Sequence, residues 1–362
     1  MPDFLDELCV RVEKAARTQT KLRPVGGGTK NFYGGPLEGE EVDLRPWQGI
    51  VEYEPTELVM TIKAGTPLHT VEAALAAEKQ ELAFEPPRLG GPNHQHSTIG
   101  GVVASGLAGP ARLAKGGVKD YVLGCTLLDG RAQLLHFGGV VMKNVAGYDV
   151  SRVIPSSMGT LGIAVELSIK VMPVAPAEAT LVFELPVNEA IRQSNTWLSK
   201  PLPINATFWE QGRLTVRLRG ASAAIQTAIK TMGGQELPQA QAQAFWASVR
   251  DQQHSFFTQA GDLWRLALPP TTADLAMHGQ SVHEWGSGLR WFRPEPGMQA
   301  SDIRAVIGRA KGHATLYKTD NTEARQHAFH MPDAVMTKLQ RKLKAQFDPA
   351  GIFSINRLAP IL

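Results

Sequence analysis

The chain has 362 residues, of which 43% are hydrophobic and 20% are charged, so it can bury a core and suits two domains of ordinary size. Its net charge of +3 is spread without any run of five or six lysines and arginines, which gives no reason to expect nucleic-acid binding. Two cysteines, Cys9 and Cys125, are too few for a disulfide framework, and we expect reduced thiols, with Cys125 in the core.

Nothing in the sequence has the character of a targeting segment. The first residues carry acidic side chains and no long apolar core, unlike a secretory signal peptide. No apolar stretch approaches the about 20 residues that a membrane span needs. We therefore expect a cytoplasmic protein, peripheral on an inner membrane at most as part of a complex.

Helical and strand patterns alternate in the first half of the chain. Thr66 and Pro67 are typical of a helix start. A proline- and glycine-rich connection over 85–117 is unusually long, and connections of this length are usually functional. The periodicity predicts helices over 3–18 and 66–80, and strands over 21–25, 49–55, 58–65, 121–130, 132–139 and 160–174.

The pattern changes after "PVAP" at 173–176. The second half is typical of an α+β domain whose helices cover one face of an antiparallel sheet. A final amphipathic helix is predicted within 333–358, before a turn with proline and glycine. The other elements predicted here are alternating, strand-like segments over 179–186, 203–211, 213–220, 262–270, 283–294 and 313–319, and helices over 189–200, 221–234, 240–257 and 300–312.

Three segments contain more small residues than ordinary turns require. "RPVGGGTKNF" at 23–32 has neither Walker A nor Rossmann spacing. Its glycines could let successive N–H groups converge on an anion, and a flexible hairpin turn explains them equally well. Residues 90–110 suit a helix start that faces a phosphate, or a turn packed closely on a sheet. "KNVAGYDVSRVIPSSMGTLGIAVE" at 143–166 indicates a backbone close to a large, flat, anionic cofactor.

Other features have ordinary explanations. His94 and His96, and His327 and His330, form two pairs without the carboxylates or cysteines that would complete a metal site, so we predict none. The tryptophans of the second half suit core packing or a protein interface.

The order of the motifs points to a family. "RPVGGGTKNF", "KAGTPLHTVEAAL", "TIGGVVASGLAG", "KNVAGYDVSRVIPSSMGTLGI" and "KAQFDPAGIFSINRL" together resemble the FAD-binding oxidoreductases of the vanillyl-alcohol oxidase, or PCMH, type. "HEWGSGLRWFRP" at 283–294 is similar to a segment of the E subunits of bacterial glycolate oxidases. The resemblance extends over nearly the whole chain and is strongest before residue 172 and in the C-terminal tail.

The resemblance implies an α+β fold in three parts. A PCMH-type FAD-binding domain of two subdomains would occupy 1–172, and a smaller α+β cap domain with an antiparallel sheet would occupy 173–330. A C-terminal segment over 331–362 would return to the FAD domain. The resemblance implies non-covalent FAD, because the 23–32 loop lacks the histidine or cysteine that attaches flavin in covalent members.

The resemblance also assigns residues to FAD. The loop over 25–31 and the backbone near 98–101 would cradle the pyrophosphate, and the later glycines would line the flavin and adenosine. Ser354 and Ile355 depart from the family's usual Asn-Pro-Gly-Lys/Arg tail. The assigned residues are Val25, Gly26, Gly27, Gly28, Thr29, Lys30, Asn31, Thr98, Ile99, Gly100, Gly101, Ser105, Lys143, Asn144, Gly147, Tyr148, Asp149, Gly159, Thr160, Leu161, Gly162 and Asn356.

Catalytic residues are less clearly marked. Oxidation of a 2-hydroxy acid needs a cation for the carboxylate and a base for the hydroxyl proton. Related dehydrogenases carry a Gly-Asp-Gly-Asn-x-His segment in the cap, and this chain has no counterpart. Arg290 and then Arg265 are candidates for the cation and His283 for the base, although such arginines are more often structural ion-pair partners.

The resemblance implies a subunit of a complex that oxidises glycolate, a small 2-hydroxy acid, to glyoxylate. Its partners would be a larger FAD-binding subunit and an iron–sulfur subunit, because this chain has no cysteine cluster for such a centre. Two alternatives remain open: a structural FAD-binding partner without its own catalysis, and a stand-alone flavin-dependent 2-hydroxy-acid dehydrogenase.

Overall fold

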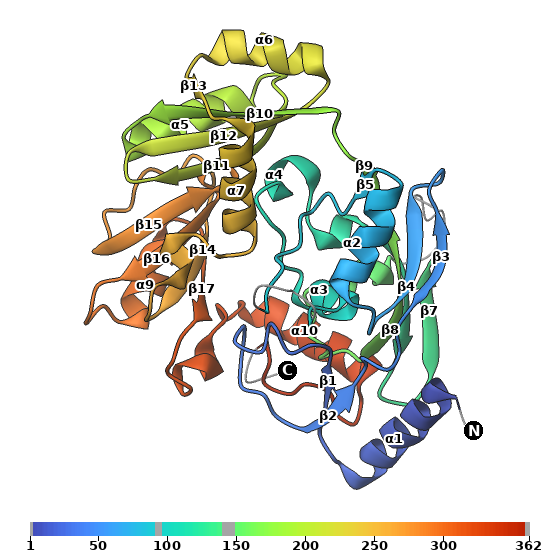
Figure 1. The fold of residues 1–362 in the computed structure, drawn as a ribbon. Helices are drawn as coiled ribbons and strands as arrows, with labels where there is room; N and C mark the ends of the chain where they lie inside the picture. The colour runs from blue at the N-terminus through green and yellow to red at the C-terminus, as the bar shows by residue number, and fades with distance from the viewer. Residues whose placement is uncertain (1–2, 91–95, 140–148, 359–362) are drawn as a thin grey trace. The chain divides into compact units, whose positions relative to one another are not determined.

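The computed structural model describes residues 3–90, 96–139 and 149–358, and its chain divides into two compact units (Figure 1). Unit 1 comprises Met1–Leu107, Gly117–Pro173 and Thr322–Leu362, and unit 2 comprises Ala108–Gly116 and Val174–Asn321. Both units combine helices with antiparallel sheet, which agrees with the predicted α+β class. Among the described residues, no helix is both long and apolar enough to cross a membrane.

A five-stranded antiparallel sheet forms one half of unit 1. Strand β8 (Ile163–Lys170) alternates strictly between buried and half-buried residues, as a strand with one face on a core should. Helix α3 (Ile99–Ser105) packs on β8 and on β4 (Val59–Lys63), and helix α2 (Leu68–Ala77) buries Leu68, Val71 and Leu75. The strand order is β3 (Ile50–Glu54), β4 (Val59–Lys63), β8 (Ile163–Lys170), β6 (Val122–Leu128) and β7 (Leu134–Gly138).

The other half of unit 1 joins the two ends of the chain. Helix α1 (Phe4–Thr18) packs on the parallel pair β1 (Leu22–Val25) and β2 (Glu40–Asp43). The tail that follows helix α10 (Ala334–Phe347) pairs with β1, because Leu22 N–H donates to Ile352 O at 2.7 Å and Ser354 N–H donates to Leu22 O at 2.9 Å. The remaining elements are β5 (Gln80–Glu81), β9 (Met172–Pro173) and the 3-10 turns η1 (Val118–Asp120), η2 (Val150–Val153) and η4 (Ala324–His327).

Unit 2 is built on one eight-stranded sheet in which every pairing is antiparallel. The short helix α4 (Arg112–Lys115) packs near β11 (Ile204–Glu210) and the 3-10 turn η3 (Trp285–Ser287). The strand order is β13 (Gln235–Glu236), β10 (Ala177–Glu184), β12 (Arg213–Gly220), β11 (Ile204–Glu210), β15 (Gly279–Glu284), β16 (Leu289–Pro294), β14 (Leu263–Ala267) and β17 (His313–Lys318).

Helices pack on both faces of this sheet, so the expectation of one covered face was wrong. Leu181 of β10 packs in one cluster with residues of α5 (Val187–Leu198) and α6 (Ser222–Met232). Its neighbour Thr180 points the opposite way and accepts a hydrogen bond from Trp246 of α7 at 3.0 Å. Both residues are buried, which requires cover on each face. The other helices of unit 2 are α7 (Gln239–Arg250), α8 (Ser255–Thr258) and α9 (Ala300–Arg309).

The tail's packing against β1 yields a stability prediction. Phe353 is fully buried in a cluster with Leu22, Leu128 and Ile163. Its replacement in Phe353→Ala should lower the free energy of unfolding by about 3–5 kcal/mol, because it leaves a cavity in a packed core. Val10→Ala, on an α1 side chain that is 64% exposed, is the control, expected within about 0.5 kcal/mol of the original chain. Denaturant unfolding of both variants measures this, and equal midpoints would contradict the packing.

Candidate functional site

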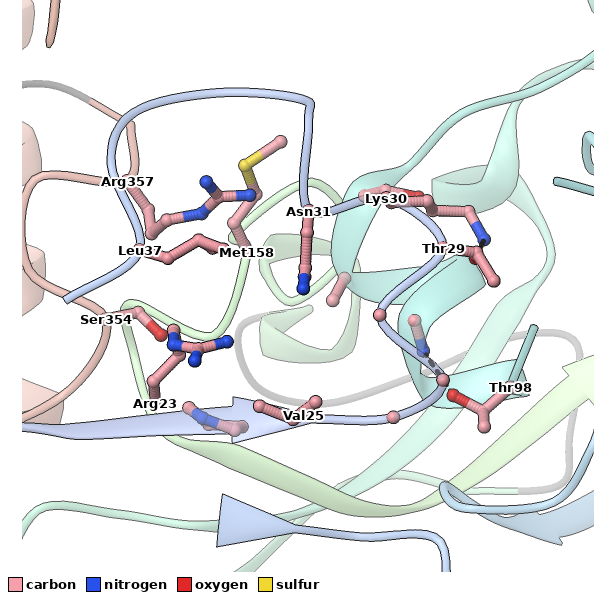
Figure 2. A pocket seen from close by; sticks show the side chains of 17 residues that line it. Arg23, Val25, Thr29, Lys30, Asn31, Leu37, Thr98, Met158, Ser354 and Arg357 are labelled. Atoms are coloured by element: carbon pink, nitrogen blue, oxygen red, sulfur yellow. Dashed lines mark hydrogen bonds between the residues drawn. The ribbon is translucent and has the colours of Figure 1, made fainter. Parts of the chain in front are cut away.

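A hollow of about 100 Å³ lies in unit 1 at the end of β1, between the loop that follows this strand, helix α3 and the C-terminal tail (Figure 2). We call it the β1 hollow. Of the residues assigned to the cofactor, those that line it are Val25, Gly26, Gly27, Gly28, Thr29, Lys30, Asn31, Thr98, Gly101 and Ser105. Lining residues that sequence reasoning missed are Arg23, Pro24, Leu37, Ala104, Met158, Ser354 and Arg357.

The glycines of the loop are required by the protein's own packing. A Cβ on Gly26 would lie 2.2 Å from Thr98 Oγ1, and one on Gly27 would lie 1.4 Å from the backbone oxygen of His96. Gly28 has a φ of +68°, which L side chains rarely adopt. The loop therefore packs directly on residues 96–98. This close packing requires the glycines, which sequence reasoning had explained by contact with a cofactor.

The same loop presents a row of unused donors. Within the described residues, none of the backbone N–H groups of residues 26–30 donates a hydrogen bond to another group, whereas Asn31 N–H donates to Gly28 O at 3.0 Å. Successive free N–H groups on a curved backbone form a site suited to an anion. The loop can therefore bind a phosphate or carboxylate without any change in its existing hydrogen bonds.

Cationic side chains add to this character. Arg23 pairs with Glu41 at 2.5 Å through Nη2, but its Nε is buried and has no hydrogen-bond partner among the described residues. Figure 2 shows the Arg23 guanidinium and the Asn31 amide directed into the space that the loop encloses. Lys30 Nζ donates to Ser97 Oγ at 2.9 Å, and burial lowers the pKa of Lys30 to about 8. No Asp or Glu occurs among the described residues that line the β1 hollow, so the hollow is electropositive.

Helix α3 offers fewer free N–H groups to the β1 hollow than its sequence suggested. The N–H groups of Ile99, Gly100 and Gly101 already donate to Thr66 O, Ala64 O and Thr98 Oγ1. Ile99 is fully buried, and a Cβ on Gly100 would lie 2.8 Å from Ala64 O, so neither residue lines the β1 hollow. Close packing of a turn on the sheet, the second explanation given for residues 90–110, therefore accounts for Gly100.

The C-terminal tail reaches the β1 hollow through Ser354 and Arg357. Asn356, which the resemblance assigns to the cofactor, donates from Nδ2 to Glu38 Oε1 at 3.1 Å and does not line the β1 hollow. The Arg357 guanidinium donates to the backbone oxygens of Tyr33 and Gly35, and burial, with a further effect of Arg325 and Arg23, lowers the pKa of Arg357 to about 10.

The residues before β8 lie around the β1 hollow and beside it. Gly159, with a φ of +72°, lies between Pro24 and Ser354, each 3.3 Å from the position of an added Cβ. Gly162, at the start of β8, packs on Leu128. Thr160 and Leu161 line a second hollow of about 350 Å³.

Asp149 is the one other assigned residue of this segment that the structure describes. Asp149 pairs with Arg152 at 2.7 Å. Lys143, Asn144, Gly147 and Tyr148 lie outside the described residues, as does His94 of the first histidine pair.

Arg290 and His283 are cross-strand neighbours in the interior of unit 2. The Arg290 guanidinium donates to the backbone oxygens of Thr272, Ala273 and Ser287, and burial lowers the pKa of Arg290 to about 10. All of these contacts are structural. Arg265, half-buried on β14, lies over the Trp285 ring at 5.3 Å.

His283 is 2% exposed and its Nδ1 has no hydrogen-bond partner in the described residues. Burial, followed by the charge of Arg290, lowers the pKa of His283 to about 3. Cys125 is a core thiol, as predicted, and burial raises its pKa to about 12. No three His, Cys, Asp or Glu residues in the described ranges gather closely enough to hold a metal ion.

Comparison with known proteins defines the class. Residues 1–138 match the family model described as FAD binding domain. The fold is similar to that of alkyldihydroxyacetonephosphate synthase, with a TM-score of 0.65 and 14% identity, covering 96% of this chain and 73% of that one. The chain is an FAD-linked oxidoreductase subunit of mixed α+β fold.

Two curated relatives narrow this class. The chain is 38% identical over 356 residues to the glycolate oxidase subunit GlcE of Escherichia coli (strain K12), covering 98% of this chain and 97% of that protein. It is 29% identical to the glycolate oxidase subunit GlcD of Bacillus subtilis (strain 168), covering 64% of this chain and 49% of GlcD. The chain belongs to the family of the glycolate oxidase subunit GlcE.

The environment of His283 predicts an effect of pH on stability. Because its pKa is about 3 in the folded chain and about 6.5 when unfolded, the unfolded chain binds one more proton between these values. The free energy of unfolding should therefore fall as pH is lowered from 6.5 towards 4, by up to roughly 1.4 kcal/mol per pH unit. In His283→Leu this part of the pH dependence should disappear, and in His69→Gln, an exposed histidine of α2, it should remain. Urea unfolding at several pH values measures it, and parallel curves for all three chains would contradict the assignment.

Proposed function

We propose that this chain is the FAD-binding subunit of a heteromeric glycolate oxidase that oxidises glycolate to glyoxylate and carries electrons through a non-covalent flavin. Its likeness to GlcE over almost the full length of both chains supports this proposal. So do the free N–H groups of residues 26–30, which provide an anion site in a chain with an FAD binding domain.

The residues of the β1 hollow fit the pyrophosphate of FAD. The N–H groups of 26–30 would hold its oxygens, and the buried Arg23 Nε would gain the acceptor that it lacks. At about 100 Å³ the hollow suits the pyrophosphate rather than the whole dinucleotide, since sites for drug-sized molecules are about 300–1,000 Å³. Bound FAD would supply the chemistry of the reaction by accepting two electrons and releasing them to a partner.

The other assigned residues stay part of this proposal. We propose that Lys143, Asn144, Gly147 and Tyr148, with Asp149 and the 159–162 turn, line the flavin and adenosine. We also propose that the FAD-binding domain covers 1–172, the cap domain 173–330 and the C-terminal segment 331–362. The 23–32 loop has no histidine or cysteine, which supports non-covalent binding.

The proposed partners are a larger FAD-binding subunit of the GlcD type and an iron–sulfur subunit. The likeness to both GlcE and GlcD supports a complex that pairs two related flavoproteins. We place this complex in the cytoplasm, peripheral on the inner membrane at most through its partners.

One observation favours a second candidate, a structural FAD-binding partner without its own catalysis. Arg290 and His283, the residues that sequence reasoning chose for substrate, are both buried, and within the described residues Arg290 donates to backbone oxygens only. In this case the larger subunit alone would bind and oxidise the 2-hydroxy acid.

An absorbance spectrum of the purified single chain, followed by anaerobic addition of glycolate, distinguishes the candidates. Flavin bands that bleach with glycolate would show catalysis by this chain alone. Bands that bleach only after the partner subunits are added would show a relay, and bands that never bleach in the complex would show a structural flavin. A chain without flavin, both alone and in the complex, would contradict the proposed function.

Arg23 provides a directed test of the cofactor site. Arg23→Gln removes the charge-assisted hydrogen bond to the pyrophosphate, worth about 1.5–3 kcal/mol, so the Kd for FAD should rise roughly 10- to 100-fold. Arg45→Gln is the control, since Arg45 also pairs with a carboxylate, that of Asp43, but does not line the hollow. Titration of the flavin-free chains with FAD measures both values, and equal affinity would remove Arg23 from the site.

A further inference from the structure

Helix α10 lies on the surface of unit 1 with little of its length covered. Among its 14 residues, Phe347 in the last turn is the one that is buried. Val335, Met336 and Leu339 are 81%, 46% and 59% exposed, and Met331 just before the helix is 47% exposed. Isolated helices of this length are marginal in water, and exposed apolar groups of this kind mark interaction sites.

The exposed side chains of α10 are arranged by type. Val335 and Leu339, four residues apart, form an exposed apolar stripe with Met336 next to it. The half-buried Leu343, four residues further on, continues the stripe to the second hollow, which it lines. Lys338 and Lys342 border this stripe on one side only, since each lies three residues from one of its members. The helix contains no acidic residue. Its solvent face is therefore an apolar stripe with an uncompensated basic edge.

We propose that α10 docks into a groove on the larger, GlcD-type flavoprotein subunit, and that this groove is apolar at its centre and acidic along one rim. The inference rests on the proposed function, because it takes the heteromeric complex as given. Helices that bind in grooves do so through anchors at this spacing. Because Lys338, Arg341 and Lys342 are positively charged, the facing rim of the partner's groove must be acidic to complement them.

Two other occupants fit the surface less well. A second copy of this chain would bring the same three cations together across a two-fold axis, with no acid on the helix to compensate them. Helices that lie in a membrane surface carry a broad apolar face, often with tryptophan or phenylalanine, and α10 exposes neither. The narrow stripe with charge on one side suits a protein groove.

Two variants of the full chain test the proposal: Leu339→Asp and the charge reversal Lys338→Glu with Lys342→Glu. Each should weaken binding to the purified larger subunit at least tenfold, while FAD content and melting temperature of the variant chain stay unchanged. Val10→Asp, on the exposed face of α1, is the matched control and should bind normally. Salt should weaken binding of the original chain and have less effect on the charge-reversed one.

Hydrogen exchange provides a second measurement that needs no variant. Amides of residues 334–343 should exchange rapidly in the single chain and slowly in the complex, with no slowing when FAD alone is added. Unchanged affinity in both variants, or unchanged exchange in the complex, would overturn the docking site. So would loss of self-association, or of binding to phosphatidylglycerol vesicles, as the main effect of Leu339→Asp. If the original chain binds no partner subunit at all, the proposed complex fails before its interface is tested.

Discussion

A buried ion pair between Lys344 and Asp348 fixes the C-terminal tail, and the β1 hollow depends on it. Lys344 Nζ lies 2.6 Å from Asp348 Oδ2 and also donates to Phe353 O and to Thr160 O, at 2.9 and 2.5 Å. The carboxylate of Asp348 in turn accepts from Ile352 N–H and Phe353 N–H. Burial lowers the pKa of Lys344, although Asp348 opposes the shift. Such a pair is kept where every polar atom has a partner, and here it joins the C-terminal segment 344–353 to Thr160 in the turn before β8.

The consequence for the site is geometric. The tail residues Ile352 and Ser354 pair with Leu22, the first residue of β1, and so hold in place the strand that leads into the 26–30 loop. The loop then packs so closely on residues 96–98 that only glycine fits at positions 26 and 27. Packing holds this backbone in place, and within the described residues the N–H groups of 26–30 have no partners. A preorganised row of donors of this kind loses little entropy when an anion binds.

Sequence reasoning identified the segments of the site better than the contacts inside it. The loop residues 25–31 with Thr98, Gly101 and Ser105 all line the β1 hollow, because glycine-rich segments in a fixed order are visible in one dimension. Ile99 and Gly100 do not line it. A glycine in the sequence indicates that another group lies close to the backbone, but it does not show whether that group is a ligand or part of the protein. The two covered faces of the eight-stranded sheet were missed for a similar reason, as buried threonines such as Thr180 look like exposed positions.

Arg23 and Arg357 were missed because their positions near the hollow depend on tertiary pairing. Arg23 lies in a strand, where an arginine usually indicates an exposed edge, and the signal available was its place directly before a glycine-rich loop. Arg357 follows the two residues at which the tail departs from the family motif. Both arginines come together only because the tail pairs with β1. Long-range pairing of this kind, fixed by Lys344 and Asp348, has no periodic signature in the sequence.

Arg23 of unit 1 differs from Arg290 and Arg293 of unit 2 in a way that bears on function. In unit 2, Arg290 and Arg293 donate to backbone oxygens and so stabilise loops from within the sheet. In unit 1, Arg23 keeps a buried Nε without an acceptor beside free backbone donors. A buried donor without a partner costs free energy in the free protein, which a bound anion would recover. Of these three arginines, Arg23 is the one with an unmet demand for an acceptor, so the charge available to a ligand lies at the β1 hollow and not at the arginines of the sheet.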